Sequence, residues 1–227
     1  GRLSDRLGKR TVFVVIGLLL FTLANLSFIL AENYVNMLAI RVLQGLAAAL
    51  TITASIALVS ELSQQGNRGE NMGIYNSFRL IGFGVGPLAS GILIETGPFM
   101  IPYIGEMSGF VAAFCVAAGA SLLSAILVAL MVRDPEVTKP STEKLVFKVR
   151  SDRPGILLDP IFTLGLATFV MALGFALLTS IEPHVNERLS QGAFLFSIQI
   201  STLIGAIAVV QPFIGAASDR FGRKIHS

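Results

Sequence analysis

The chain has 227 residues, of which 53% are hydrophobic and only 14% are charged, and its formal net charge is +3 at pH 7. A soluble domain is about 25% charged, so this composition argues against a cytosolic enzyme and against a disordered protein. The single cysteine, Cys115, excludes an intramolecular disulfide, and with only two histidines we expect neither a metal site nor a cofactor.

Six apolar segments are long enough to cross a bilayer as helices, which takes about 20 residues each. In chain order they cover residues 11–31, 35–60, 73–94, 105–132, 161–181 and 193–214. The sequence therefore predicts an all-α, polytopic membrane protein. Because the chain opens at Gly1 inside a charged motif, we expect it to be a fragment of a longer protein.

The basic residues gather on alternate loops. Fourteen of the 17 lysines and arginines lie in 1–10, in the loop after the second segment, in 133–160 or in the C-terminal tail. Cytoplasmic loops retain positive charge, so both ends and the 133–160 linker are predicted to be cytoplasmic in a multi-pass protein of the cell membrane. This topology explains the basic balance without a nucleic-acid partner.

The two ends of the chain repeat one pattern. Residues 1–10 and 215–224 both read G-x-x-S-D-R-x-G followed by two basic residues, 214 positions apart. A repeat of this kind indicates internal duplication, which is typical of transporters.

Four motifs together resemble the major facilitator superfamily. The opening copy resembles its signature loop between helices two and three, and the closing copy resembles the loop between helices eight and nine. Residues 41–45 resemble the R-x-x-Q-G motif of helix four, and residues 73–91 resemble the helix-five motif of proton-coupled antiporters. The resemblance implies helices three to eight of twelve: residues 1–132 in the N-terminal bundle, 133–160 as the linker, and 161–227 in the C-terminal bundle.

The resemblance assigns the two repeated loops to a conformational switch that latches the bundles together. Its residues are Gly1, Asp5, Arg6, Gly8, Lys9, Arg10, Asp219, Arg220, Gly222, Arg223 and Lys224. We expect the partner of Asp219 near residues 68–73. The alternative is a positively charged hairpin with a buried turn and no latching role.

Arg41 is an arginine inside a membrane segment, where an unpaired charge costs several kcal/mol. Gln44 follows on nearly the same face, and Gly45 permits close helix contact. The resemblance implies a polar network that relays or senses protons; a purely structural hydrogen-bond hub is the alternative. Glu106 is the candidate proton-carrying carboxylate, against an interfacial role, whereas we expect Glu61 to be a solvated helix end.

Arg79 also lies inside a segment, where it would snorkel or pair with Glu61 or a cavity anion. The helix-five motif consists of Gly73, Gly82, Gly86, Pro87 and Gly91, and the resemblance implies that it packs against the other bundle. Ordinary tight packing is the alternative. Candidate cavity residues are Thr51, Ser55, Met171, Phe175 and Thr179, although the last three could equally face lipid or packing neighbours.

The resemblance implies a secondary active transporter that works by alternating access as a monomer. Its predicted activity is the proton-coupled efflux of small amphipathic organic compounds, with the bilayer, the cargo and protons as partners. Uptake of a sugar or organic acid and a transport-dead receptor or scaffold are the alternatives. No set of nucleophile and base stands out that would indicate an enzyme.

Overall fold

The computed structural model describes residues 9–63, 67–102, 105–134 and 160–221. The chain divides into two compact units, Gly1–Ser141 with Ser197–Ser227, and Thr142–Phe196. The first unit contains α2 (Arg10–Ile29), α3 (Tyr34–Leu62), α4 (Arg68–Thr96), β1 (Phe99–Ile101), β2 (Gly105–Met107), α5 (Gly109–Met131) and most of α8 (Ala193–Phe221). The second contains α6 (Pro160–Ser180), α7 (Glu182–Leu189) and the start of α8. The predicted division at 133–160 stays a prediction.

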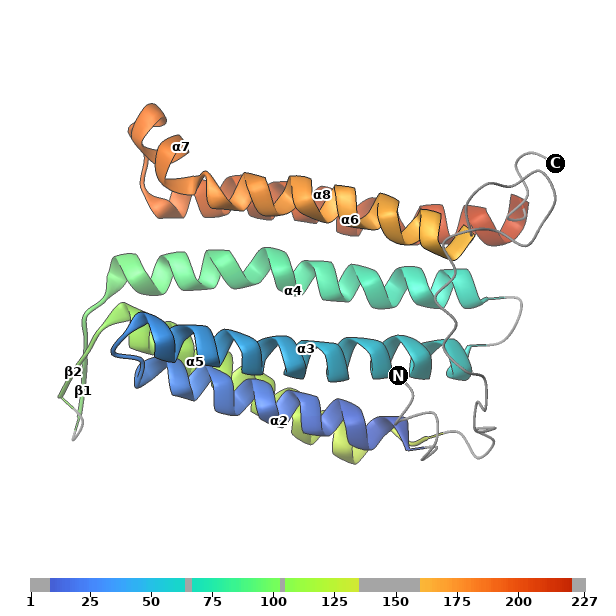
Figure 1. Ribbon diagram of the computed structural model, residues 1–227, viewed down its shortest axis with the longest axis horizontal. Helices are drawn as coiled ribbons and strands as arrows, with labels where there is room; N and C mark the ends of the chain where they lie inside the picture. Colours follow the sequence, from blue (N-terminus) through green and yellow to red (C-terminus); the bar gives the residue numbers. More distant parts are fainter. Residues whose placement is uncertain (1–8, 64–66, 103–104, 135–159, 222–227) are drawn as a thin grey trace. The chain divides into compact units, whose positions relative to one another are not determined.

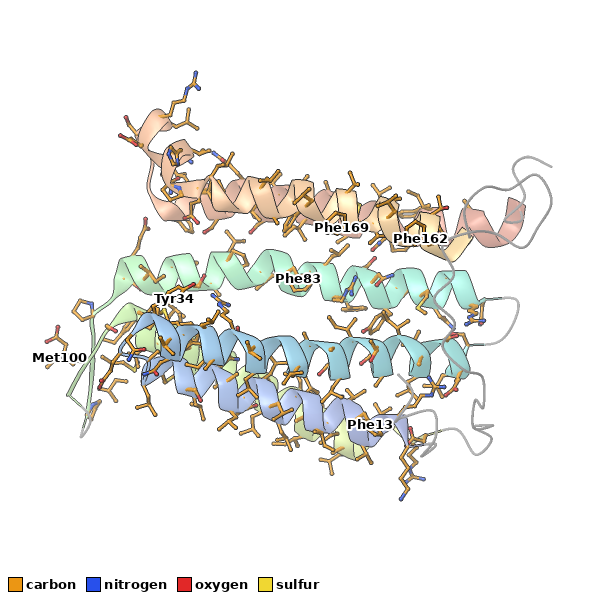
Figure 2. All side chains as sticks on the ribbon, viewed as in Figure 1. Phe13, Tyr34, Phe83, Met100, Phe162 and Phe169 are labelled. Atoms are coloured by element: carbon orange, nitrogen blue, oxygen red, sulfur yellow. The ribbon has the colours of Figure 1, made fainter. Side chains whose placement is uncertain are left out.

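The long helices confirm the predicted all-α membrane architecture. In lipid every backbone N–H and C=O must be satisfied within the protein, which favours long helices. Five described helices are long and apolar enough to cross a membrane, and a sixth span results if α6 and α7 are counted together. Apolar side chains project outward along the helices (Figure 2). Lipid or further helices would cover such a surface.

The first unit is built around α2, which packs along both α3 and α5 (Figure 1). Its small core contains Ala24, Phe28 and Ile40, with Phe114 of α5 against it. Close approach of α2 and α3 requires Gly17, because a Cβ there would lie 2.2 Å from Thr51 Oγ1. Small residues at such crossings let membrane helices pack backbone against backbone.

The predicted start of the fourth segment at residue 105 is wrong. Residues 99–101 and 105–107 pair as two antiparallel strands in which Met100 lies opposite Glu106, and Figure 2 shows Met100 pointing away from the helices. Gly105 has φ +93°, a left-handed conformation that an α-helix does not contain. The helix α5 begins instead at Gly109, where the Ser108 hydroxyl accepts the Val111 N–H at 3.3 Å as an N-cap.

The predicted fifth segment corresponds to α6, which ends at Ser180. The chain then enters the eight-residue helix α7, whose first turn contains Glu182 and a proline. The axes of the described parts of α6 and α7 differ by 43°. Proline suits the first turn of a helix because its missing N–H would have no partner there. The second unit therefore bends where the sequence alone suggested a plain loop.

Candidate functional site

One polar cluster lies where α2 and α4 begin and α3 ends. Arg10 Nη2 lies 2.5 Å from Glu61 Oε1, and the side chains of Arg10 and Glu61 are 13% and 27% exposed. Arg68 donates a hydrogen bond to the Ser60 hydroxyl. These residues border a cavity of about 580 Å³ that Thr53 and Met72 also line. Glu61 lies exposed at the end of α3, as expected, and it also forms an ion pair there with Arg10 of the switch motif.

Asp134, which follows α5, links the end of that helix to the start of α2. Its Oδ1 accepts hydrogen bonds from the Thr11 N–H at 2.8 Å and from the Thr11 hydroxyl at 2.9 Å. Thr11 is the second residue of α2, whose flanking Lys9 makes no side-chain cap. The first N–H groups of a helix have no partner within it, and a carboxylate there also favours the helix dipole. Asp134 thus caps α2 from the far end of α5.

Most of the predicted switch lies outside the described residues. Gly1, Asp5, Arg6 and Gly8 fall there, as do Gly222, Arg223 and Lys224. Asp219 and Arg220 belong to the last turn of α8, and only their backbone is described. The latch itself therefore stays a prediction, and Arg10 is the member of the motif with a defined partner.

A second polar network lies inside the membrane-span helices. Arg41 Nη1 donates to Gln44 Oε1 at 3.0 Å, as their spacing on one helix face predicts. Gln44 Nε2 in turn donates to Asn25 Oδ1 on α2 at 3.1 Å. Asn25 is 8% exposed. Sequence reasoning missed Asn25, although a buried amide in an apolar run is the signal that could have found it.

Three aromatic rings, Phe28, Phe114 and Phe110, pack in a row beside the same guanidinium. The Arg41 Cζ lies 5.0 Å from the centroid of the Phe28 ring, within cation–π range. Phe28 stacks on Phe114 at 4.6 Å, and Phe110 contacts Phe114 edge-on at 4.8 Å. A Cβ on Gly45 would meet nothing within 4 Å, so this glycine serves no close contact between described residues.

Glu106, the predicted proton carrier, lies on β2 in the exposed hairpin rather than in a helix. Within the described residues Arg41 makes no ion pair with any carboxylate. The proton-relay role of Glu106 stays a prediction.

The buried face of α4 consists of Gly73, Ser77, Gly84 and Gly91. A Cβ on Gly73 would lie 3.2 Å from Pro212 Cα, so α4 and α8 approach backbone to backbone at this point. Ser77 Oγ donates to the Ala208 carbonyl at 2.8 Å, and Ser201 Oγ donates back to the Gly84 carbonyl at 2.6 Å. The motif positions Gly82 and Gly86 have open space beside them instead. Pro87 lies within a continuous α4.

Two polar atoms of α4 and α8 are buried without a hydrogen-bond partner among the described residues, Arg79 Nε and Gln211 Oε1. Snorkelling or pairing with Glu61 or a cavity anion was predicted for Arg79, and among the described residues Glu61 pairs with Arg10 instead. Arg79 is half-buried in the interior of α4. A second membrane-span arginine therefore has no carboxylate partner within the described residues.

The candidate cavity residues divide between two helices. The Thr51 hydroxyl is buried at the α2–α3 contact beside Gly17 and has no hydrogen-bond partner among the described residues, and Ser55 is half-buried one turn further on. Met171 and Phe175 are exposed on α6, and the side chain of Thr179 lies outside the described residues. The assignment of these residues to a cargo pathway stays a prediction.

The model for the Major Facilitator Superfamily matches residues 1–225, which is nearly the whole chain. The chain belongs to this superfamily. This superfamily consists of membrane transporters, so the match supports a transporter rather than an enzyme. The described residues hold no group of three or more His, Cys, Asp or Glu that could bind a metal ion.

Three relatives show the range of this family. Citrate exporter 1 of Aspergillus niger is 33% identical over 140 residues, which cover 62% of this chain and 24% of the exporter. The probable vesicular acetylcholine transporter-B of Danio rerio is 34% identical over 127 residues, 56% of this chain and 24% of that protein. Quinolone resistance protein NorA of Staphylococcus aureus is 28% identical over 112 residues, 49% of this chain and 29% of NorA.

The segments that match this chain span only about a quarter of the length of these relatives. No solved structure matches the chain. Two of these names give a cargo, citrate and acetylcholine, so the relatives support the transporter family and leave the cargo of this chain to be argued from its residues.

Proposed function

We propose that this chain forms the central helices of a secondary active transporter in the cell membrane, which exports small amphipathic organic compounds in exchange for protons. The observation that carries the proposal is the Arg41–Gln44–Asn25 network inside the membrane span. A charge there is expensive and marks function by default. Arginine does not release its proton at any working pH, so its role is to bias the protonation of a carboxylate that comes near it.

The α4–α8 contact supports alternating access. The Ser77 hydroxyl lies 2.8 Å from the Ala208 carbonyl of α8 and 2.9 Å from the Gly73 carbonyl of its own helix. If the helices separate, the Ser77 hydroxyl keeps the Gly73 carbonyl as an acceptor within α4. Separation of the helices therefore leaves no buried donor without a partner. Contacts of this kind can form and break repeatedly at low cost, which a rocking transporter requires.

Export of organic acids is the second candidate. Neither Arg41 nor Arg79 has a carboxylate partner within the described residues. An anionic cargo would neutralise such arginines while it passes, and guanidinium groups bind carboxylates in a bidentate manner. The relative named citrate exporter 1 is consistent with cargo of this chemistry.

The test is a flux assay on the whole transporter in proteoliposomes with an imposed pH gradient. Lipophilic cations and di- and tricarboxylic acids are offered separately. The proposal expects cargo movement that stops when an ionophore collapses the gradient, and loss of most of that flux in Arg41→Lys, which keeps the charge but loses the planar fork. Arg188→Lys, at an exposed position of α7, is the matched control and should transport normally. Flux that does not depend on the pH gradient would contradict proton coupling. Normal flux in Arg41→Lys would show that the Arg41 network has only a structural role.

A further inference from the structure

The two amides beside Arg41 form a chain of hydrogen bonds with a fixed direction. Arg41 has donors only, so Gln44 must present its carbonyl oxygen to the guanidinium. The amide nitrogen of Gln44 then points at α2, where Asn25 must present its own oxygen. Only a residue with an acceptor at position 25 completes this chain. Asn25 therefore determines how the Gln44 amide is oriented. Through Gln44 it also fixes the position of the guanidinium edge that donates to Gln44.

Phe28 fixes the plane of the same group. It is 3% exposed and is held in the α2–α3 core by Ala24 and Ile40 and by stacking on Phe114. A ring packed in this way cannot follow the guanidinium, so the guanidinium must adapt to the ring. Residues 25 and 28 lie one turn apart on α2, so a single helix face supplies both supports.

The contacts that hold the Arg41 guanidinium leave its other edge open. Arg41 itself is exposed, and Gln44 is its hydrogen-bonding partner among the described residues. The nitrogens that do not face Gln44 remain available as donors. A flexible arginine would lose side-chain entropy when it bound an anion, whereas a held one has already lost it.

We propose that Asn25 and Phe28 are positioning residues that hold Arg41 ready to receive a carboxylate on its open edge. The inference rests on the proposed transport function and adds the residues that prepare the site. The carboxylate belongs either to the cargo or to an acidic side chain outside the described residues. The chemistry of the contact is the same for both, and the experiment separates them.

The experiment compares Asn25→Leu with the wild type in the proteoliposome assay. Leucine has a similar size but no acceptor, so Gln44 loses its anchor. Michaelis constants and maximal rates are measured for one carboxylate cargo and one lipophilic cation, together with the pH profile of each. Ser27→Ala is the matched control, because the Ser27 hydroxyl donates to the Leu23 carbonyl of its own helix at 2.8 Å and bonds to no other helix in the described part of the chain.

If the carboxylate belongs to the cargo, Asn25→Leu raises the Michaelis constant for the acid about tenfold and leaves that for the cation within twofold. If it belongs to the protein, the pH profile of both cargoes moves toward alkaline pH by about one unit, because a misplaced arginine stabilises the carboxylate anion less. Phe28→Leu produces a smaller change of the same kind, about threefold, because only the ring contact is lost.

Unchanged Michaelis constants and pH profiles in an inserted Asn25→Leu protein would overturn the inference. If that variant fails to insert, Asn25→Asp replaces it, since aspartate keeps the acceptor oxygen and adds a competing anion. The acid should then bind more weakly or the pH profile should shift, and no change in either would again overturn the inference. A wild type without any flux would instead remove the proposed function, so the two failures are distinguishable.

Discussion

Replacement of Gly109 by alanine tests the packing of α5 on α4 most sharply. A Cβ at Gly109 would lie 2.3 Å from the Leu93 carbonyl oxygen and 2.8 Å from Ile94 Cα. Carbon and oxygen atoms in ordinary contact are about 1 Å further apart than this. Both atoms belong to the backbone of α4, so no side chain can rotate away. The two helices must therefore separate by about 1 Å at this end.

The expected cost of Gly109→Ala is about 3 kcal/mol, the upper part of the range for an overpacked contact, because the clash is with backbone. The matched control is Gly119→Ala on the same helix, where a Cβ would meet nothing within 4 Å. It should be neutral or stabilise the helix by up to about 1 kcal/mol. The assay is equilibrium unfolding in mixed micelles, followed by circular dichroism, with both variants beside the wild type. Equal stability of Gly109→Ala and Gly119→Ala would refute the close α4–α5 contact.

Three further substitutions test single contacts. Ser77→Ala should lower the free energy of unfolding by less than about 1 kcal/mol but increase the rate at which cysteines placed along α4 become accessible, since the interhelix bond to the Ala208 carbonyl is lost together with a local bond to the Gly73 carbonyl; unaltered accessibility would argue against the α4–α8 bond. Asp134→Ala should cost about 1 kcal/mol because Thr11 loses its cap, and hydrogen exchange at the start of α2 should rise; unchanged exchange there would contradict the cap. Glu61→Gln removes the ion pair with Arg10, so the melting temperature should fall and lose part of its dependence on salt, and a melting temperature equal to that of the wild type would contradict the pair.

Local features of the sequence predicted local features of the structure well. The long apolar runs correspond to the long helices, and the spacing of Arg41 and Gln44 placed them on one helix face, where their side chains form a hydrogen bond. Both signals depend on helix periodicity, which holds within a segment whatever surrounds it. The hairpin before α5 was missed because a short apolar stretch next to a long one extends the apparent segment, although Pro98 and Gly105 are the breakers that mark it.

Contacts between distant segments could not be predicted in this way. Thr11 and Asp134 are 123 positions apart, and nothing in either neighbourhood indicates the other. Asn25 becomes a candidate only when α2 is known to lie beside Gln44. For the same reason the helix-five motif did not show which of its glycines face a neighbour, since Gly73 packs on α8 while Gly82 does not.

The most direct test of the account is the sidedness of the two ends of α4. This helix has 29 residues, and at 1.5 Å per residue it is about 43 Å long, enough to cross a bilayer. Single cysteines are introduced at Asn67 and at Met100 in a Cys115→Ala background, and a membrane-impermeant thiol reagent is applied to oriented vesicles. The account predicts labelling of position 67 from the cytoplasmic side and of position 100 from the opposite side, and labelling of both positions from one side would contradict it.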